Sequence, residues 1–112
     1  MACLLHLIAL ATVLNQSVWL FDGTRDCGVF APAGRYNPGS HLIYARDFPY
    51  PITPFILAHE FCHMKSYSDG SFTNNSFIDE SRCYIAGVEG LLNPGKYAIT
   101  ERTRVTHGGY WT

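Results

Sequence analysis

The segment from Thr53 to Tyr67 restricts the possible folds of this chain more than any other segment. It reads T-P-F-I-L-A-H-E-F-C-H-M-K-S-Y, and at about 100° per residue its apolar side chains cover nearly the whole circumference of a helix. Lys65 is the one clearly solvated position. A helix that is apolar nearly all round is typical of a protein interior. We therefore expect a central helix from about Pro54 to Tyr67, capped by Thr53 and ended at Gly70.

A second helix is expected from about Phe77 to Glu89. Its opening sequence, S-F-I-D, matches a capping box formed by Ser76 and Asp79. The small residues Cys83 and Gly87 lie on one face of this helix, and a face of small side chains can approach a neighbouring helix closely. We therefore expect the two helices to pack against each other.

Short β-prone runs precede the two helices. They are S-V-W-L-F at 17–21, C-G-V-F-A at 27–31 and H-L-I-Y-A-R at 41–46, and Gly- and Pro-rich turns separate them. Residues 1–14 are almost continuously apolar and rich in the good helix formers Ala and Leu. We predict an α+β fold with an N-terminal helix, a small and mostly antiparallel sheet of about three strands, and the two helices described above.

Length and composition limit the organisation and the partners of the chain. Its 112 residues suffice for a single domain over 1–112, and 47% apolar with 15% charged residues is typical of a globular protein. The net charge is -1 and the Lys and Arg residues are scattered, so we expect no nucleic-acid partner. No apolar run reaches the roughly 18 to 20 residues that cross a bilayer, so we expect no membrane span.

The first segment also bears on localisation. Residues 1–17 resemble the apolar part of a secretory signal but lack a preceding Lys or Arg and a clear cleavage site. We favour the buried helix, with a cytoplasmic protein, over a cleaved signal with a secreted one. The sequence does not indicate an oligomeric state.

The pentapeptide H-E-F-C-H, residues 59 to 63, predicts chemistry inside the central helix. His59 and His63 are four residues apart, about one turn, so both imidazoles can point at a single ion. Glu60 lies beside them, as in the H-E-x-x-H arrangement of zinc hydrolases. There a Zn²⁺ ion binds the two histidines, a third protein ligand and a water, and the glutamate takes the proton of that water.

Two residues compete to be the third ligand. Asp69 stands six residues after His63, where metzincins have their last ligand, but Ser66 replaces the glycine that lets the chain turn in those proteins. Glu80 stands seventeen residues after His63 on the second helix, as in the glutamate-zincins. We favour Glu80 and keep Asp69 as the alternative.

Other side chains near the motif have open roles. Asp79 either orients a ligating histidine or serves the helix cap. Cys62 and Cys83 fall within the two helices, either as small core residues or as a bridge, and no C-x-x-C pair is present. The residues available to stabilise an oxyanion are Tyr67, Tyr84, His107 and Tyr110.

H-E-F-C-H followed by D-E-S-R-C-Y-I-A-G-V-E-G-L-L-N-P resembles the ImmA/IrrE-like small metallopeptidases over residues 34–94. The resemblance implies a minimal zincin-like domain with Zn²⁺ on His59, His63 and Glu80, and with Glu60 as the catalytic base. It also implies that G-R-Y-N-P-G-S-H-L-I-Y-A-R includes an edge strand that aligns peptides by β-addition. Phe61 and Cys62 depart from the small and aliphatic pair usual in the family.

The expected function is therefore that of a zinc metallopeptidase, which hydrolyses peptide bonds with a zinc-bound water activated by Glu60. Its partner would be a protein or peptide substrate. The alternative from another functional class is a non-catalytic, zinc-stabilised binding or regulatory module on the same fold. Such a site would close on the metal with four protein ligands, for example with both Asp69 and Glu80.

Overall fold

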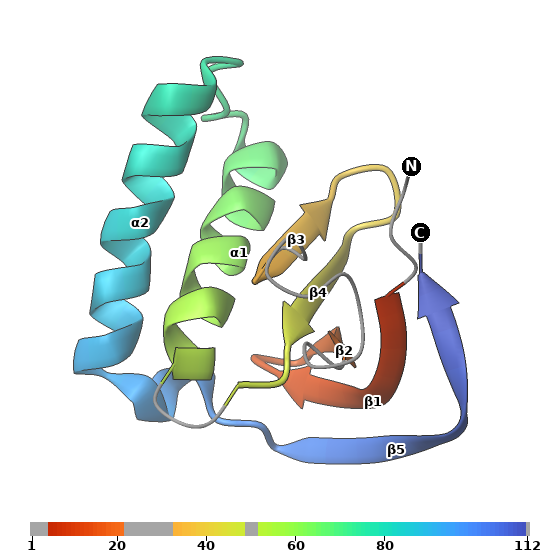
Figure 1. Cartoon of the computed structure of the whole chain (residues 1–112). Coiled ribbons are helices and arrows are strands. Elements are labelled where there is room, and N and C mark those ends of the chain that lie inside the picture. The colour runs from red at the N-terminus through yellow and green to blue at the C-terminus, as the bar shows by residue number, and fades with distance from the viewer. Residues whose placement is uncertain (1–4, 22–32, 49–51, 112) are drawn as a thin grey trace.

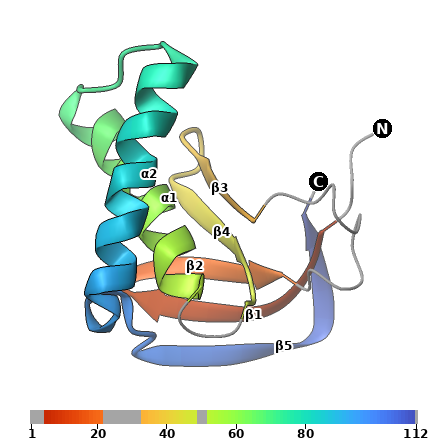
Figure 2. The ribbon, with the colours of Figure 1, turned by 60° about the vertical axis from the view of Figure 1, so that its left-hand side comes forward.

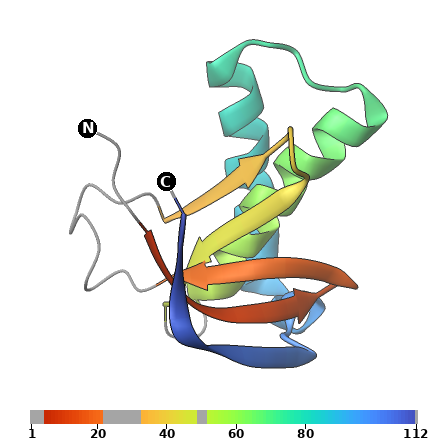
Figure 3. The same ribbon diagram turned by 90° about the vertical axis from the view of Figure 1, so that its right-hand side faces the viewer.

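The structure is a computed structural model that describes residues 5–21, 33–48 and 52–111, with the side chains of 5, 6 and 105–111 outside the description. Its elements in chain order are β1 (Leu5–Val13), β2 (Gln16–Phe21), β3 (Gly34–Asn37), β4 (Leu42–Arg46), α1 (Ile52–Asp69), α2 (Ser76–Leu92), the 3-10 helix η2 (Pro94–Tyr97) and β5 (Glu101–Trp111). The five strands form one sheet in the order β3-β4-β2-β1-β5 (Figures 1 and 3). The predicted α+β class is confirmed.

The sheet is mixed and has more strands than we expected. β1 pairs antiparallel with β2 and with β5, β3 pairs antiparallel with β4, and β2 pairs parallel with β4. The expectation of about three strands is wrong because β1 was expected as a helix and because β3 and β5 have weak local signals. β3 is a four-residue strand within a Gly- and Pro-rich stretch, and pairing with a distant strand stabilises β5. The run predicted at 27–31 lies outside the described residues.

The expected N-terminal helix is instead the strand β1. Its residues are buried in alternation from Leu7 to Val13, and two of the three partly buried residues between them, Ile8 and Leu10, are apolar, so apolar side chains lie on both faces. A run of this kind satisfies a helical and a strand pattern equally well. Pairing with β2 and β5 on its two sides stabilises this segment as a strand. Leu14 and Asn15 both have positive φ, as the tight two-residue hairpin between β1 and β2 requires.

The two helices lie on one face of the sheet, with α1 between the sheet and α2 (Figures 1 and 2). The first half of α1 is buried on nearly every side, as its sequence predicted. Ile56 and Leu57 join a core of sheet residues that includes Leu20 and Ile43. α1 is therefore a central helix, and its histidines are held by packing on both sides.

α2 approaches α1 closely where the sequence places small residues. A Cβ atom on Gly87 would lie 2.7 Å from the ring of Phe55, so only glycine fits there without a shift. Cys83 is bonded to Cys62 of α1 in a disulfide, which settles the open role of this pair as a bridge. The predicted packing of the two helices through Cys83 and Gly87 is confirmed.

The helix starts differ from the expected ones, whereas the first helix ends as predicted. α1 begins at Ile52, and the hydroxyl of Thr53 donates to the carbonyl oxygen of Phe48 at 2.6 Å and does not cap the helix. The N-cap of α2 is Asn75, whose side chain accepts from the backbone N–H of Ile78, so the predicted capping box is wrong. Gly70, with a φ of 77°, takes the left-handed conformation expected after α1.

Among the residues that the structure describes, no helix has the length and the apolar character needed to cross a membrane.

Candidate metal site between the two helices

His59 and His63 point the same ring atom at the same place. One turn of α1 separates them, and their Nε2 atoms are 3.2 Å apart. Two ligands of a tetrahedral zinc ion, each about 2.0–2.1 Å from the metal, lie about 3.3 Å from each other. The spacing of the two nitrogens therefore suits the coordination of one ion without a change of rotamer.

Glu80 of α2 completes this group. Its Oε2 lies 3.0 Å from Nε2 of His59, and its Oε1 lies 2.9 Å from Nε2 of His63. The ligand atoms of the three residues all lie within 4.8 Å of one another. The two histidine side chains are nearly buried, whereas the Glu80 side chain is 45% exposed, so the group opens toward solvent on the side of α2.

Burial also sets the protonation state of His59. It lowers the pKa of His59 below the ordinary value, although the carboxylate of Glu80 acts in the opposite direction. At neutral pH the contact between His59 and Glu80 is therefore a hydrogen bond that the neutral ring donates to the carboxylate, more than an ion pair. Neutral imidazole is the form that binds a metal ion.

Glu60 lies beside this group but belongs to a different environment. It is buried between α1 and β3, and burial, together with the charge of Glu80, raises its pKa to about 8. A hydrogen bond with the backbone of Tyr36 in β3 acts in the opposite direction. In the metal-free protein this carboxyl group therefore holds its proton at neutral pH. A cation bound by the three neighbouring ligands would lower the pKa of Glu60 toward the range in which a general base can accept and return a proton.

The approach of β3 to Glu60 depends on Gly34. A Cβ atom at this position would lie 2.6 Å from Cγ2 of Ile56, and 3.1 Å and 3.2 Å from two side-chain atoms of Glu60. Only glycine lets the strand come this close to the helix. Sequence analysis missed the role of Gly34, because the contact joins residues 22 and 26 positions apart and has no local signal.

A cavity of about 530 Å³ opens over the three potential ligands and Glu60. β3 forms one wall of it, and α2 forms the opposite wall. The rings of Tyr84 and His59 meet in a T-shaped arrangement with centroids 4.6 Å apart, and the ring of Tyr67 stacks on that of Phe72 with centroids 4.3 Å apart. The aromatic residues of the lining are Tyr36, Phe55, Tyr67, Phe72 and Tyr84. The cavity thus combines a potential metal site with several aromatic side chains, a combination typical of ligand pockets.

The alternative ligand Asp69 lies apart from this group. It is exposed at the end of α1, and its Oδ1 accepts from the backbone N–H and the hydroxyl of Ser71 at 3.0 Å and 2.7 Å. These hydrogen bonds lower the pKa of Asp69. The side chain therefore organises the loop that follows α1, and the structure brings Glu80, not Asp69, to the histidines.

Asp79 fills neither of the two roles considered for it. Its Oδ1 accepts from the backbone N–H of Thr73 at 3.1 Å and from the hydroxyl of Thr73 at 2.8 Å. The buried carboxylate therefore anchors the loop between the helices just before α2. This anchor, one residue before Glu80, helps to fix the start of the helix that carries the third potential ligand.

Two of the four candidates for oxyanion stabilisation line the cavity. Tyr67 comes from the last turns of α1 and Tyr84 from the middle of α2. The side chains of His107 and Tyr110 lie outside the part of the chain that the structure describes. Both available tyrosines are thus within the same cavity as the potential metal ligands.

Comparison of the chain with protein families, with curated proteins and with solved structures found no match. The assignment of a function therefore depends on the geometry of the site.

Proposed function

We propose that the protein is a zinc-dependent hydrolase of peptide bonds. The observation that carries this proposal is the placement of a buried carboxyl group, Glu60, next to two histidines and a glutamate whose ligand atoms converge in an open cavity. Imidazole and carboxylate ligands suit several divalent metals, and an arrangement of two histidines and one glutamate is typical of catalytic zinc. Zinc held there supplies Lewis-acid polarisation of a carbonyl group and lowers the pKa of water.

Four residues of the site have separate roles in the proposed reaction. His59, His63 and Glu80 would hold the ion, and the neutral state of His59 favours binding without the release of a proton. Glu60 would take the proton of the attacking water and return it to the leaving amine. Its position on α1, one residue after the first histidine, keeps it beside the same point in the cavity.

The position of β3 supports a peptide as the substrate. Among the strands that the structure describes, β3 lies at the edge of the sheet and has a neighbour on one side, and its residues Gly34 to Tyr36 line the cavity. An extended peptide can add to such an edge through its backbone groups. The carbonyl of a bound peptide would then lie along the wall that also contacts Glu60.

The non-catalytic alternative requires a fourth protein ligand. Among the described residues the group that could hold a metal consists of His59, His63 and Glu80 alone. Asp69, the fourth ligand that this alternative would use, faces the loop after α1. A group of three ligands that faces a cavity leaves a position for water, which supports an enzyme.

The test combines metal content with hydrolysis. Elemental analysis of the purified protein should find one zinc per chain, and His63→Ala and Glu80→Ala should each lose it. Asp69→Asn is the matched control, because it removes a carboxylate from the alternative ligand and should keep the metal. Zinc-loaded protein should then cleave members of a peptide mixture, as detected by mass spectrometry. Wild-type protein that binds no zinc, even after reconstitution, would exclude the proposed function.

A further inference from the structure

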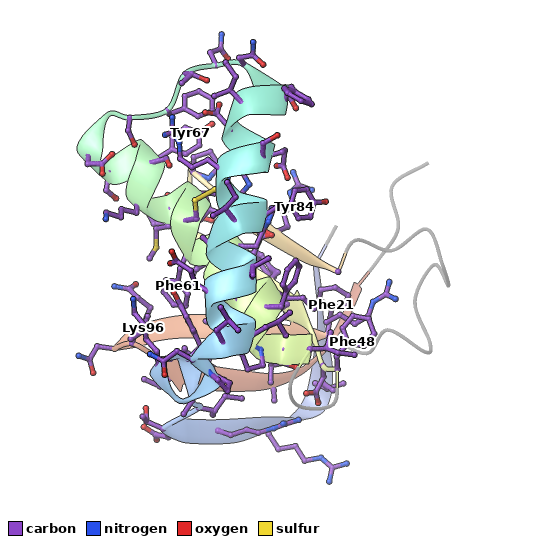
Figure 4. All side chains as sticks on the ribbon, turned by 90° about the vertical axis from the view of Figure 1, so that its left-hand side faces the viewer. Phe21, Phe48, Phe61, Tyr67, Tyr84 and Lys96 are labelled. Atoms are coloured by element: carbon purple, nitrogen blue, oxygen red, sulfur yellow. A yellow bond between two sulfur atoms is a disulfide. The ribbon has the colours of Figure 1, made fainter. Side chains whose placement is uncertain are left out.

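The outer face of α2 exposes an unusual number of large apolar side chains. α2 packs on α1 through its opposite face, where Cys83 and Gly87 are buried. The side chains of the outer face are between 42% and 81% exposed, with Phe77 and Leu92 the most exposed. The residues of this outer face are Phe77, Ile78, Tyr84, Ile85, Val88, Leu91 and Leu92. Figure 4 looks onto the molecule from the side of α2.

The extent of this face is that of a protein interface. Its exposed apolar area is on the order of 700–800 Å², which is more than the largest patch on a typical monomer. About 800 Å² per partner is the usual contribution to a stable interface. The outer face has no charged residue, and Ser81, a small polar side chain, lies in its middle. An exposed apolar face of this extent is typical of a surface that contacts another protein.

The outer face is complementary to itself when two copies meet antiparallel. A two-fold axis beside the midpoint of Tyr84 and Ile85 places Phe77 next to Leu92 of the partner subunit. The same axis places Val88 next to the small Ser81 of the partner subunit. The small side chain of Ser81 leaves room for Val88 of the partner subunit, so the side chains of the two helices can interdigitate.

The charges at the border of the face favour the same arrangement. Arg82 and Glu89 are exposed, and because they are seven residues apart they lie on the same flank of α2. An antiparallel pair brings Arg82 to within about two residues, or ~3 Å along the axis, of Glu89 of the partner subunit. The other N–H groups of Arg82, which donates one hydrogen bond to the carbonyl of Ser71, can reach across. Two copies would thus form two ion pairs.

We propose that the protein forms a homodimer in which the outer faces of two α2 helices pack antiparallel. The inference depends on the surface of α2 alone, and the dimer would form with or without metal at His59, His63 and Glu80. Tyr84 belongs both to this face and to the cavity of the metal site, so the two cavities of the dimer would lie beside the interface.

The first test measures the mass in solution. Light scattering after size-exclusion chromatography of the wild type at micromolar concentration should give twice the 12.5 kDa of the chain. Ile85→Glu places a charge in the centre of the interface and should weaken dimerisation at least about 100-fold, so that this variant is monomeric. Ile99→Glu is the matched control, because Ile99 is a partly exposed apolar residue outside the outer face, and it should remain dimeric.

A charge reversal tests the antiparallel orientation of the two α2 helices. Arg82→Glu should weaken the dimer several-fold, and the double variant Arg82→Glu with Glu89→Arg should restore it. Circular dichroism would show that all variants are folded. A monomeric wild type, which would leave the outer face to a different partner, overturns the proposal. So does a dimer that Ile85→Glu leaves intact, or a double variant as weak as Arg82→Glu.

Discussion

Glu60 and Gly34 meet where β3 approaches α1, and each depends on the other. The carboxyl group is buried because the strand covers it, and the strand can cover it because its first residue has no side chain. Burial in turn raises the pKa of Glu60 to about 8. The raised pKa of Glu60 is therefore a consequence of the close packing of β3 on α1. We expect substitution of Glu60 to affect catalysis and substitution of Gly34 to affect this packing.

Glu60→Gln should greatly slow hydrolysis while zinc stays bound. The amide cannot accept the proton of the attacking water, so the rate should fall by about 10²–10⁴-fold, the usual contribution of a general base. The three residues of the ligand group are unchanged, so elemental analysis should still find one zinc per chain. A Gln variant as active as the wild type would show that Glu60 is not the base.

Gly34→Ala should disturb the active-site wall. The new methyl group would lie 2.6 Å from Ile56 and would push β3 away from α1, at a cost of about 1–3 kcal/mol of unfolding free energy, as measured by urea denaturation. Activity should fall while zinc content is unchanged. Gly95→Ala is the matched control, since a Cβ atom there meets nothing within 4 Å. Equal stability of the two variants would contradict the packing argument.

At the scale of elements, the site depends on the position of α2 relative to α1. α1 supplies two potential ligands and α2 supplies the third, so any sliding of the helices separates them. The disulfide between Cys62 and Cys83 lies next to His63 on one helix and one turn from Glu80 on the other. It is therefore placed to hold the ligands in register.

Loss of the disulfide should weaken zinc binding. The double variant Cys62→Ala, Cys83→Ala should bind zinc more weakly in a competition titration, because Glu80 is no longer held against the histidines. It should also lose about 2–4 kcal/mol of unfolding free energy, as expected for a bridge of this loop length. A reductant should have the same effect on the wild type, since Cys62 lines a second cavity of about 580 Å³ that is open to solvent. Unchanged zinc affinity in both cases would show that the bridge serves the fold alone.

At the scale of the whole molecule, a buried titratable group couples the site to the stability of the fold. An unfolded glutamate has a pKa near 4.5, whereas folded Glu60 has a pKa of about 8. Between these values the folded protein holds a proton that the unfolded chain has released. The stability that Glu60 contributes is thus complete below the lower value and is lost as the pH rises through the higher one.

The metal-free protein should accordingly become less stable as the pH rises from about 5 to about 9. Urea denaturation at several pH values would measure this loss, and Glu60→Gln should lose less stability over the same interval. The lowered pKa of His59 acts at the acidic end of this interval, and it is common to both proteins. The difference between the two curves of unfolding free energy against pH therefore measures the contribution of Glu60. Parallel curves would contradict the raised pKa of Glu60.

The sequence alone determined the elements whose patterns are local. The apolar circumference of the segment at 54–67 predicted a buried helix, Gly70 predicted its end, and the four-residue spacing of His59 and His63 predicted that their rings converge. The small residues of the second helix predicted its close packing. All these features depend on neighbours within one or two turns, where helical geometry relates sequence to position directly.

The tertiary structure decided what depends on distant residues. Residues 5–13 are a strand because β2 and β5 pair with them on both sides, and their apolar pattern did not distinguish a strand from a helix. Glu80, not Asp69, reaches the histidines because the packing of α2 brings it there. β3 covers Glu60 because Gly34 permits a close approach. Such contacts join residues that are far apart in the chain, and their free energy depends on the folded arrangement and not on any local pattern.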